Sequence, residues 1–326
     1  MTLILSHTDV AALIDRADVL AAVERAHADL ALGTAVVPAP PAVSLDGTAF
    51  VPMVAAAGSA GAAAVKLLAD LPANQARGLP VQRSVILVTS ASDGGCEALI
   101  DGRLVTAVRT AAASAVATRY LARPASSVLG LIGAGALAVE HTRAVARVRD
   151  IETVLVWSRS AATVERFRTA VADLGVAVRA MPSPESVTRA ADVLCTLTPS
   201  REPIVRGAWF GEGLHVNAVG APPRADHREV DGEAMRRARV IVDSRGTTLS
   251  KSGDTLLALA DGAITEAEVS TELGQVILGR ATGRVGDHDI TLFNSVGIGL
   301  QDLVTARLLI DKARAEGRGT EVELSA

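Results

Sequence analysis

The chain has 326 residues, of which 49% are hydrophobic and 21% charged, and its net charge is −4. This balance excludes an intrinsically disordered chain, and the length predicts two compact units. Aromatic residues make up only 2% of the chain, and the charge is negative. Proteins that bind nucleic acid stack bases on aromatic side chains and present a basic face, so nucleic acid is excluded as a partner.

The cysteines and histidines predict a reduced, cytoplasmic protein without a metal site. Cys96 and Cys195 stand far apart, in no disulfide or metal-binding spacing, and the six histidines form no HExxH or HxH pair. The first residues lack the basic and apolar regions of a signal peptide. No apolar run reaches the roughly 18 residues of a membrane span, so we expect no membrane association.

The first part of the chain predicts a mixture of helices and strands. Residues 8–33 indicate two helices, the first capped by Thr8 and the second ended by Gly33. The prolines of residues 38–41 force an extended segment. A hairpin and an alanine-rich helix follow, at residues 84–89 paired with 97–100 and at residues 106–121.

The pattern then changes to short apolar runs alternating with helix-like segments, which indicates βαβ units and a parallel sheet. We therefore predict an α/β fold in which a Rossmann doubly wound parallel sheet, residues 121–296, is inserted in a mixed α+β domain of residues 1–120 and 297–326. The expected strands are residues 128–132, 153–157, 193–197, 215–219 and 240–243, and the expected helices include residues 136–149, 161–174 and 297–315.

A glycine-rich turn follows the first of these strands. The run Gly133-Ala134-Gly135-Ala136-Leu137-Ala138 matches the dinucleotide fingerprint in its expected context, between a strand and a helix. The first glycine permits the tight turn and the second lets the backbone approach a pyrophosphate at the helix N-terminus. An ordinary strand–turn–helix with small residues is the plain alternative.

The end of the second strand indicates which cofactor binds. Here NAD-dependent proteins place an acid that holds the ribose 2′-hydroxyl, but this chain has Ser158-Arg159-Ser160. An arginine between two hydroxyls suits a 2′-phosphate, so we expect NADPH, with NADH as the alternative. The alternative interpretation is that Arg159 is a solvated surface arginine with no ligand.

Two cations lie where their chemistry is unusual. Lys66 falls in the apolar run 62–68, where burial would lower its pKa and let it transfer protons. Arg109 is expected near the start of a helix, where the helix N-terminus also attracts an anion. A surface lysine and a surface ion pair are the plain alternatives for these two residues.

Together these segments resemble the ornithine cyclodeaminase/mu-crystallin family over most of the chain. The matching stretches are Lys66, Asn74 and Gly78-Leu79-Pro80, then LVTAVRTAA (104–112), IGAGA (132–136), NAVGA (217–221), VDSR (242–245), SGD (252–254) and FNSVG (293–297). The resemblance implies a homodimer, built by the N-terminal domain, and hydride transfer between a nicotinamide and the α-carbon of an amino or imino acid. It also implies that Lys66 and Arg109 hold the substrate carboxylate, with Lys66 serving in proton transfer.

The same resemblance carries further residues over to the site. Besides Lys66 and Arg109, the implied substrate-binding residues are Asn74, Arg83, Pro222, Ser295 and Gly297. Besides the glycine turn and Ser158-Arg159-Ser160, the implied cofactor-binding residues are Thr110, Thr196, Leu197, Thr198, Val219, Gly220 and again Ser295.

The chain departs from the family pattern in ways that bear on substrate. Cyclodeaminases have an aspartate after Gly-Ala, where this chain has Pro222 in a longer loop that resembles the mu-crystallin branch. No carboxylate-binding arginine stands in residues 38–42, so Arg83 is one candidate substitute. Lys251 replaces a common glutamate and Val81 a common threonine.

We therefore expect an NADPH-dependent ketimine reductase that acts on a small cyclic imine bearing a 2-carboxylate, of the pyrroline- or piperideine-2-carboxylate type. The first alternative is an NAD(P)-dependent amino-acid or N-substituted amino-acid dehydrogenase. The further alternatives are a cyclodeaminase-type lyase and a weakly catalytic NADPH-dependent binding protein.

Overall fold

A computed structural model describes residues 1–41, 43–45 and 48–324, apart from the Gln75 side chain; Ala42, in the proline run, lies outside the described residues. The chain divides into two compact units, residues 1–109 with 298–326 and residues 110–297. The boundary between Arg109 and Thr110 falls inside helix α3 (Gly102–Leu121), whereas the sequence predicted this domain boundary at the end of that helix. We describe each unit by itself.

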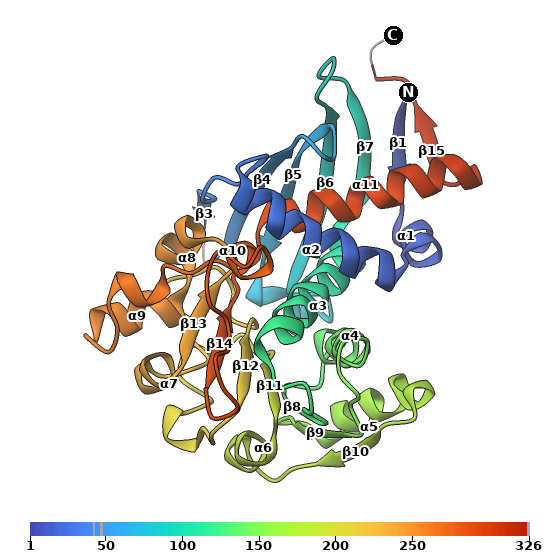
Figure 1. Cartoon of the computed structure of the whole chain (residues 1–326). Helices are drawn as coiled ribbons and strands as arrows, with labels where there is room; N and C mark the ends of the chain where they lie inside the picture. The colour runs from blue at the N-terminus through green and yellow to red at the C-terminus, as the bar shows by residue number, and fades with distance from the viewer. Residues whose placement is uncertain (42, 46–47, 325–326) are drawn as a thin grey trace. The chain divides into compact units, whose positions relative to one another are not determined.

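The first unit is built on a mixed sheet (Figure 1). Among the described residues its strand order is β15-β1-β7-β6-β5-β4-β2, with β3 also paired to β4; β1 and β7 run parallel and the other pairs antiparallel. Its elements are β1 (Thr2–Leu5), α1 (His7–Leu13), α2 (Arg16–Leu32), β2 (Ala35–Val36), β3 (Val43–Leu45), β4 (Thr48–Ala57), β5 (Ala62–Asp70), the 3₁₀ helix η1 (Pro72–Arg77), β6 (Gln82–Ser90), β7 (Cys96–Asp101), α11 (Gly299–Glu316) and β15 (Thr320–Val322).

Helices α2 and α11 lie on one face of this sheet, as Figure 1 shows, because alternate residues of β4, β5 and β6 are apolar and pack with the apolar residues of α11. The predicted pair of N-terminal helices and the β6–β7 hairpin are confirmed. The prediction that Thr8 caps the first helix is wrong. Ser6 is the cap, since its side chain accepts from the Asp9 N–H.

The second unit contains a parallel sheet with helices between its strands. Its elements are β8 (Val128–Ile132), α4 (Ala136–Val145), β9 (Thr153–Trp157), α5 (Ala161–Ala170), η2 (Ala172–Leu174), β10 (Ala177–Ala180), α6 (Pro184–Ala190), β11 (Val193–Thr196), η3 (Gly207–Trp209), β12 (His215–Ala218), α7 (Gly232–Arg237), β13 (Arg239–Val242), α8 (Arg245–Lys251), α9 (Gly253–Ala260), η4 (Glu266–Val269), α10 (Leu273–Ile277) and β14 (Thr291–Asn294).

The strand order of this sheet among the described residues is β10-β9-β8-β11-β12-β14-β13, and every neighbouring pair is parallel. The predicted α/β class with a doubly wound parallel sheet is therefore confirmed. The order reverses between β8 and β11, and such a switch point opens a crevice at the carboxyl ends of the strands. The glycine turn follows β8, so the fold places it at this point.

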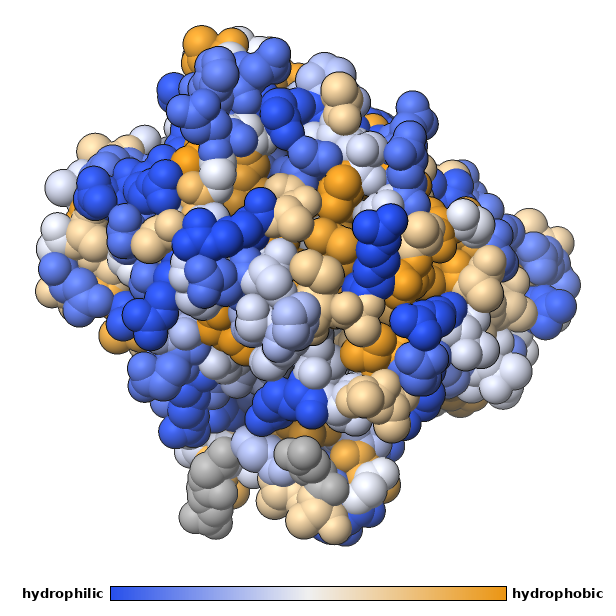
Figure 2. Space-filling view, turned by 90° about the horizontal axis from the view of Figure 1, so that it is seen from below, coloured by the Kyte–Doolittle hydropathy of each residue, from blue (hydrophilic) through white to orange (hydrophobic). Residues whose placement is uncertain are grey.

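Hydrophobic residues also reach the surface. Figure 2 shows one face of the molecule on which they lie in patches between hydrophilic residues. Among the described residues, no helix is long and apolar enough to cross a membrane. The same residues contain no group of three histidines, cysteines or acids arranged to hold a metal ion.

Candidate functional site

Lys66 lies in a buried ion pair inside the first unit. It projects from β5 on the face that packs against α11, and only 1% of its surface is exposed. Its Nζ is 2.8 Å from Oδ2 of Asp302 on α11 and 3.5 Å from the Thr106 hydroxyl on α3. The expectation of a partly buried lysine in a strand holds, and the plain alternative of a surface lysine is wrong.

The approach of α11 to the sheet explains why these two charges meet. Gly299 is the first residue of α11, and a Cβ there would come within 2.8 Å of the Met53 carbonyl on β4. Met53 is the cross-strand partner of Lys66. Because Gly299 lets the helix start against β4, the first turn of α11 brings Asp302 beside Lys66.

Arg109 binds the same carboxylate from the other side. Its Nε donates to Asp302 Oδ1 at 3.1 Å, and Nη1 donates to Gln301 Oε1 at 2.8 Å. Since Oε1 accepts from the arginine, the Gln301 amide nitrogen faces His27 Nε2, 3.2 Å away. His27 must then accept at Nε2, which matches its complete burial and a pKa lowered by burial to about 4.

The cluster carries an excess of positive charge. Burial and then the charge of Arg109 lower the pKa of Lys66 to about 8, while the charge and hydrogen bond of Asp302 oppose this. With Lys66 protonated, two cations share one carboxylate. A buried charge needs a partner of opposite sign, so the arrangement suits one further anion, such as a substrate carboxylate.

Arg109 and Asn74 lie in surroundings that differ from those predicted. Arg109 lies about two turns into α3, which begins at Gly102, so the helix N-terminus is not what attracts an anion to it. Asn74 is buried, but its side chain closes a turn: Nδ2 donates to the Pro80 carbonyl at 2.9 Å. The substrate role of Asn74 stays a prediction.

Arg83 is not brought to Lys66. In the β5–β6 pairing Lys66 lies opposite Ile86, and Arg83 is three residues away from Ile86 on β6. Side chains alternate along a strand, so Arg83 points to the opposite face of the sheet. There it lines, with Leu67, a cavity of about 520 Å³. Within one chain, Arg83 therefore does not replace the missing carboxylate-binding arginine.

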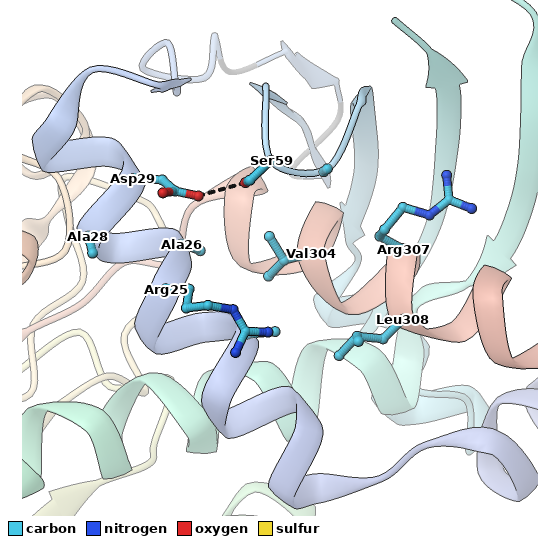
Figure 3. Close-up of a pocket in the computed structure, with 10 residues that line it drawn as sticks. Arg25, Ala26, Ala28, Asp29, Ser59, Val304, Arg307 and Leu308 are labelled. Carbon is cyan, nitrogen blue, oxygen red and sulfur yellow. Dashed lines mark hydrogen bonds between the residues drawn. The ribbon is translucent and has the colours of Figure 1, made fainter.

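A separate cavity of about 270 Å³ lies in the first unit between α2, α11 and the β4–β5 turn (Figure 3). Arg25 and Arg307 are among its lining residues, and the Ser59 hydroxyl donates to Asp29 at 2.6 Å across its edge. None of the predicted site residues lines this cavity.

The glycine turn of the second unit has the geometry that a dinucleotide needs. Gly133 has φ +113°, and a Cβ there would meet the Leu197 carbonyl at 2.9 Å, so only glycine fits. Gly135 is the N-cap of α4 without a side-chain cap, and a Cβ there would enter open space. Uncapped N–H groups facing open space can receive a phosphate, so these residues fit a dinucleotide.

The segment after β9 carries an exposed arginine between two serines. Arg159 is exposed and makes no ion pair with another described residue. Ser160 caps α5 by accepting from the Thr163 N–H at 3.4 Å, and the Ser158 hydroxyl accepts from the Ser160 N–H at 3.4 Å. No acid stands in this segment.

Apart from Thr110, the other predicted cofactor residues lie at strand ends of this unit. Thr110 is buried in α3. Thr196 ends β11, with Leu197 and Thr198 directly after it. The remaining predicted cofactor residues, Val219, Gly220 and Ser295, follow β12 or β14, and the predicted substrate-binding residues Pro222 and Gly297 lie in the same two segments. Parallel strands end at one edge, so these segments share the crevice side of the sheet.

One acid, Asp243, organises the segment after β14. Its Oδ2 accepts from the Ser295 hydroxyl and from the Gly297 N–H, each at 2.8 Å. Gly297 has φ +78°, a conformation that glycine adopts without strain. The Ser295 hydroxyl is thus hydrogen-bonded within the protein, and this bond stabilises the turn after β14.

Four acids at the centre of these networks were not predicted from the sequence: Asp243, Asp254, Glu229 and Asp302. Asp302 interrupts the apolar face of α11, and a charge among buried apolar positions was a signal that could have identified it. Asp243 and Asp254 lie in stretches already noted, and Glu229 ends the loop after β12. Their partners come from distant segments, which the sequence pattern does not reveal.

A parallel sheet with a glycine turn at its switch point defines the class of dinucleotide-binding folds. The family model of the ornithine cyclodeaminase/mu-crystallin family matches residues 1–317. The chain belongs to this family, as the sequence predicted.

Three relatives illustrate the range of the family. The chain is 36% identical to the Thermococcus litoralis Δ1-pyrroline-2-carboxylate reductase, solved with NADH and L-proline, with a TM-score of 0.95 over 98% of this chain and 100% of that one. An archaeal alanine dehydrogenase dimer with bound NAD is 32% identical, with a TM-score of 0.94 over 99% of each chain. The ketimine reductase mu-crystallin of Mus musculus is 39% identical over 72% of this chain and 70% of its own length.

Proposed function

We propose that the protein is a nicotinamide-dependent oxidoreductase that reduces the C=N bond of a small cyclic imine carrying a 2-carboxylate. The observation that carries the proposal is the buried cluster of Lys66, Arg109 and Asp302, in which two cations share one carboxylate. The relative that reduces Δ1-pyrroline-2-carboxylate, matched over nearly the whole chain, supports this substrate class.

In this proposal the first unit holds the substrate. Arg109 and Lys66 bind the carboxylate, which completes the charge balance of the cluster. Lys66 has a pKa of about 8, so near neutral pH it carries a proton that it can give to the imine nitrogen. A protonated imine accepts a hydride more readily, and fixing the carboxylate orients its carbon.

The second unit binds the cofactor, which when bound in its reduced form supplies a hydride to the imine carbon. Gly135 and the N-terminus of α4 receive the pyrophosphate. Arg159, with Ser158 and Ser160, receives a ribose 2′-phosphate, and this is why we propose NADPH over NADH. The two relatives solved with NADH or NAD make NADH the alternative to be tested beside it.

A second candidate function is the oxidation of a primary amino acid. It is favoured by the archaeal alanine dehydrogenase, which the chain matches over 99% of each chain. The same charge cluster would hold the carboxylate of an amino acid. A cyclodeaminase is disfavoured by Pro222, because proline offers no group to bind the second amine of a diamino acid.

The proposal includes a cytoplasmic homodimer. The archaeal relative is a dimer, and exposed apolar residues of β4, β5 and β6 support the same assembly here. The location rests on the two widely separated cysteines, both free among the described residues.

The test is NADPH oxidation, followed at 340 nm, with Δ1-pyrroline-2-carboxylate and Δ1-piperideine-2-carboxylate, repeated with NADH. We expect turnover with NADPH, and we expect Lys66→Ala to lower kcat/KM by about a hundredfold or more, as for the loss of a general acid. Lys66→Gln, which keeps the side chain long but removes its positive charge and its transferable proton, should be as inactive. Lys312→Ala, at the far end of α11, is the matched control.

The alternatives give different results in the same assay. Oxidation of L-alanine with NADP or NAD, without imine turnover, would favour the amino-acid dehydrogenase. Tight NADPH binding without turnover on the imines or amino acids would favour a binding protein. Full activity of Lys66→Ala would contradict the role given to Lys66.

A further inference from the structure

A buried glutamate connects the ends of two central strands of the parallel sheet. Glu229 is fully buried and accepts hydrogen bonds at both carboxylate oxygens. Oε1 accepts from the Thr198 N–H at 2.6 Å and from the Thr198 hydroxyl at 2.7 Å. Oε2 accepts from the Thr196 hydroxyl at 2.7 Å and from the Gly220 N–H at 2.8 Å. These donors lie at the carboxyl ends of β11 and β12.

A second acid fixes the backbone that carries Glu229. Asp254, on α9, accepts at Oδ1 from the Glu229 N–H at 2.8 Å and from the Val230 N–H at 3.1 Å. Its Oδ2 faces the Asn294 amide, at the end of β14, at 3.3 Å. Asp254 therefore ties the backbone of Glu229 to α9 and, through Asn294, links it to the end of a third strand.

The segment held by Glu229 packs closely against the glycine turn. A Cβ at Gly220 would come within 2.2 Å of the Thr198 nitrogen, and one at Gly133 within 2.9 Å of the Leu197 carbonyl. Residues 197–198 are thus enclosed between the turn after β8 and the turn after β12. In a doubly wound sheet, these turns line the crevice where a dinucleotide binds.

We propose that Glu229 is a positioning residue for the cofactor: it fixes the turns after β11 and β12 so that they receive the nicotinamide half of the dinucleotide. This inference rests on the proposed function. It adds a residue to that function, because neither the charge cluster nor the glycine turn gives Glu229 a role in the reaction.

The chemistry of the carboxylate supports this role. Burial raises the pKa of Glu229 to about 7, and the hydrogen bonds from Thr196 and Thr198 act against this increase. An amide in place of the carboxylate offers one oxygen and turns an NH₂ group toward donors. A buried N–H of Thr198 or Gly220 then lacks an acceptor, so the turns must move to find one.

The experiment compares Glu229→Gln with the wild type in binding, without substrate. NADPH and NADH are titrated by nicotinamide fluorescence, and 2′,5′-ADP and ADP, which lack the nicotinamide half, by calorimetry. We expect Glu229→Gln to weaken binding of the full cofactor by about tenfold or more and to leave the fragments within about twofold of the wild type. Glu233→Gln, an exposed change on α7, is the matched control.

A purely structural role would give another result: equal weakening of cofactor and fragment, or unchanged binding of both, overturns the inference. If Glu229→Gln does not fold, Thr196→Val removes one donor to the carboxylate with little change in shape, and the same selective loss is expected. A wild type that binds neither cofactor contradicts the proposed function itself, which separates that failure from this one.

Discussion

At the scale of single residues, the site depends on how one carboxylate divides its oxygens. Asp302 gives one oxygen to Lys66 and the other to Arg109. Gln301, its neighbour on α11, binds a further nitrogen of Arg109 and is itself held by His27. The guanidinium is therefore held in one orientation, so the carboxylate that we propose binds there would cost little conformational entropy.

Asp302→Asn tests this division through the pH dependence of the reaction. Lys66 can donate only while protonated, so kcat/KM for imine reduction should fall as the pH rises through its pKa of about 8. Asp302 raises that pKa, and removing its charge should move the descending limb to lower pH by about one to three units. Profiles from about pH 4 to pH 10 measure this shift.

The matched control for this change is Asp311→Asn, an exposed acid on the same helix. It should leave the descending limb where the wild type has it. A limb that stays in place in Asp302→Asn would show that Lys66 is not the group that titrates.

At the scale of elements, the glycine turn combines two glycines with different functions. Gly133 is constrained by its positive φ and by the Leu197 carbonyl, whereas Gly135 has φ −81° and free space at its Cβ position. The fold requires the first glycine, and the proposed cofactor site requires the second. Substituting each glycine in turn separates these two requirements.

Gly135→Val should fold like the wild type and weaken NADPH binding by about tenfold or more, because its side chain occupies the space of the pyrophosphate. Gly133→Val should instead lower the free energy of unfolding by about 1–3 kcal/mol, since valine is strained at φ +113°. Thermal unfolding and fluorescence titration measure both changes. A lower Tm in Gly135→Val with unchanged affinity would reverse the two roles.

The elements that the sequence predicted well are those whose pattern is local. The strands β8 and β9 match the apolar runs residue for residue, because both faces of a central parallel strand are buried. The strand β14 was missed: Thr291–Asn294 has polar ends, and its place between β12 and β13 depends on long-range pairing. Likewise Lys66 was identified from its apolar run, while its partner Asp302 lies on a helix far along the chain.

At the scale of the whole molecule, the open face of the first sheet favours assembly of two chains. Residues of β4, β5 and β6 alternate, and those that point away from α11 include Val54, Leu67 and Val85, each about two-fifths exposed. Leu67 and Val85 are direct cross-strand partners, so their side chains lie together on that face. Neighbouring apolar residues exposed on a sheet are typical of a protein interface.

Leu67→Glu should therefore convert the proposed dimer to a monomer, because a stable interface buries about 800 Å² on each partner and a carboxylate buried within it must give up its hydration. Light scattering after gel filtration gives the mass of the particle. Val285→Glu, at an even more exposed valine of the second unit, is the matched control and should leave the mass at two chains. A dimeric Leu67→Glu variant would mean that the open sheet face is not the interface. A monomeric wild type would mean that the exposed apolar residues do not pair two chains at all.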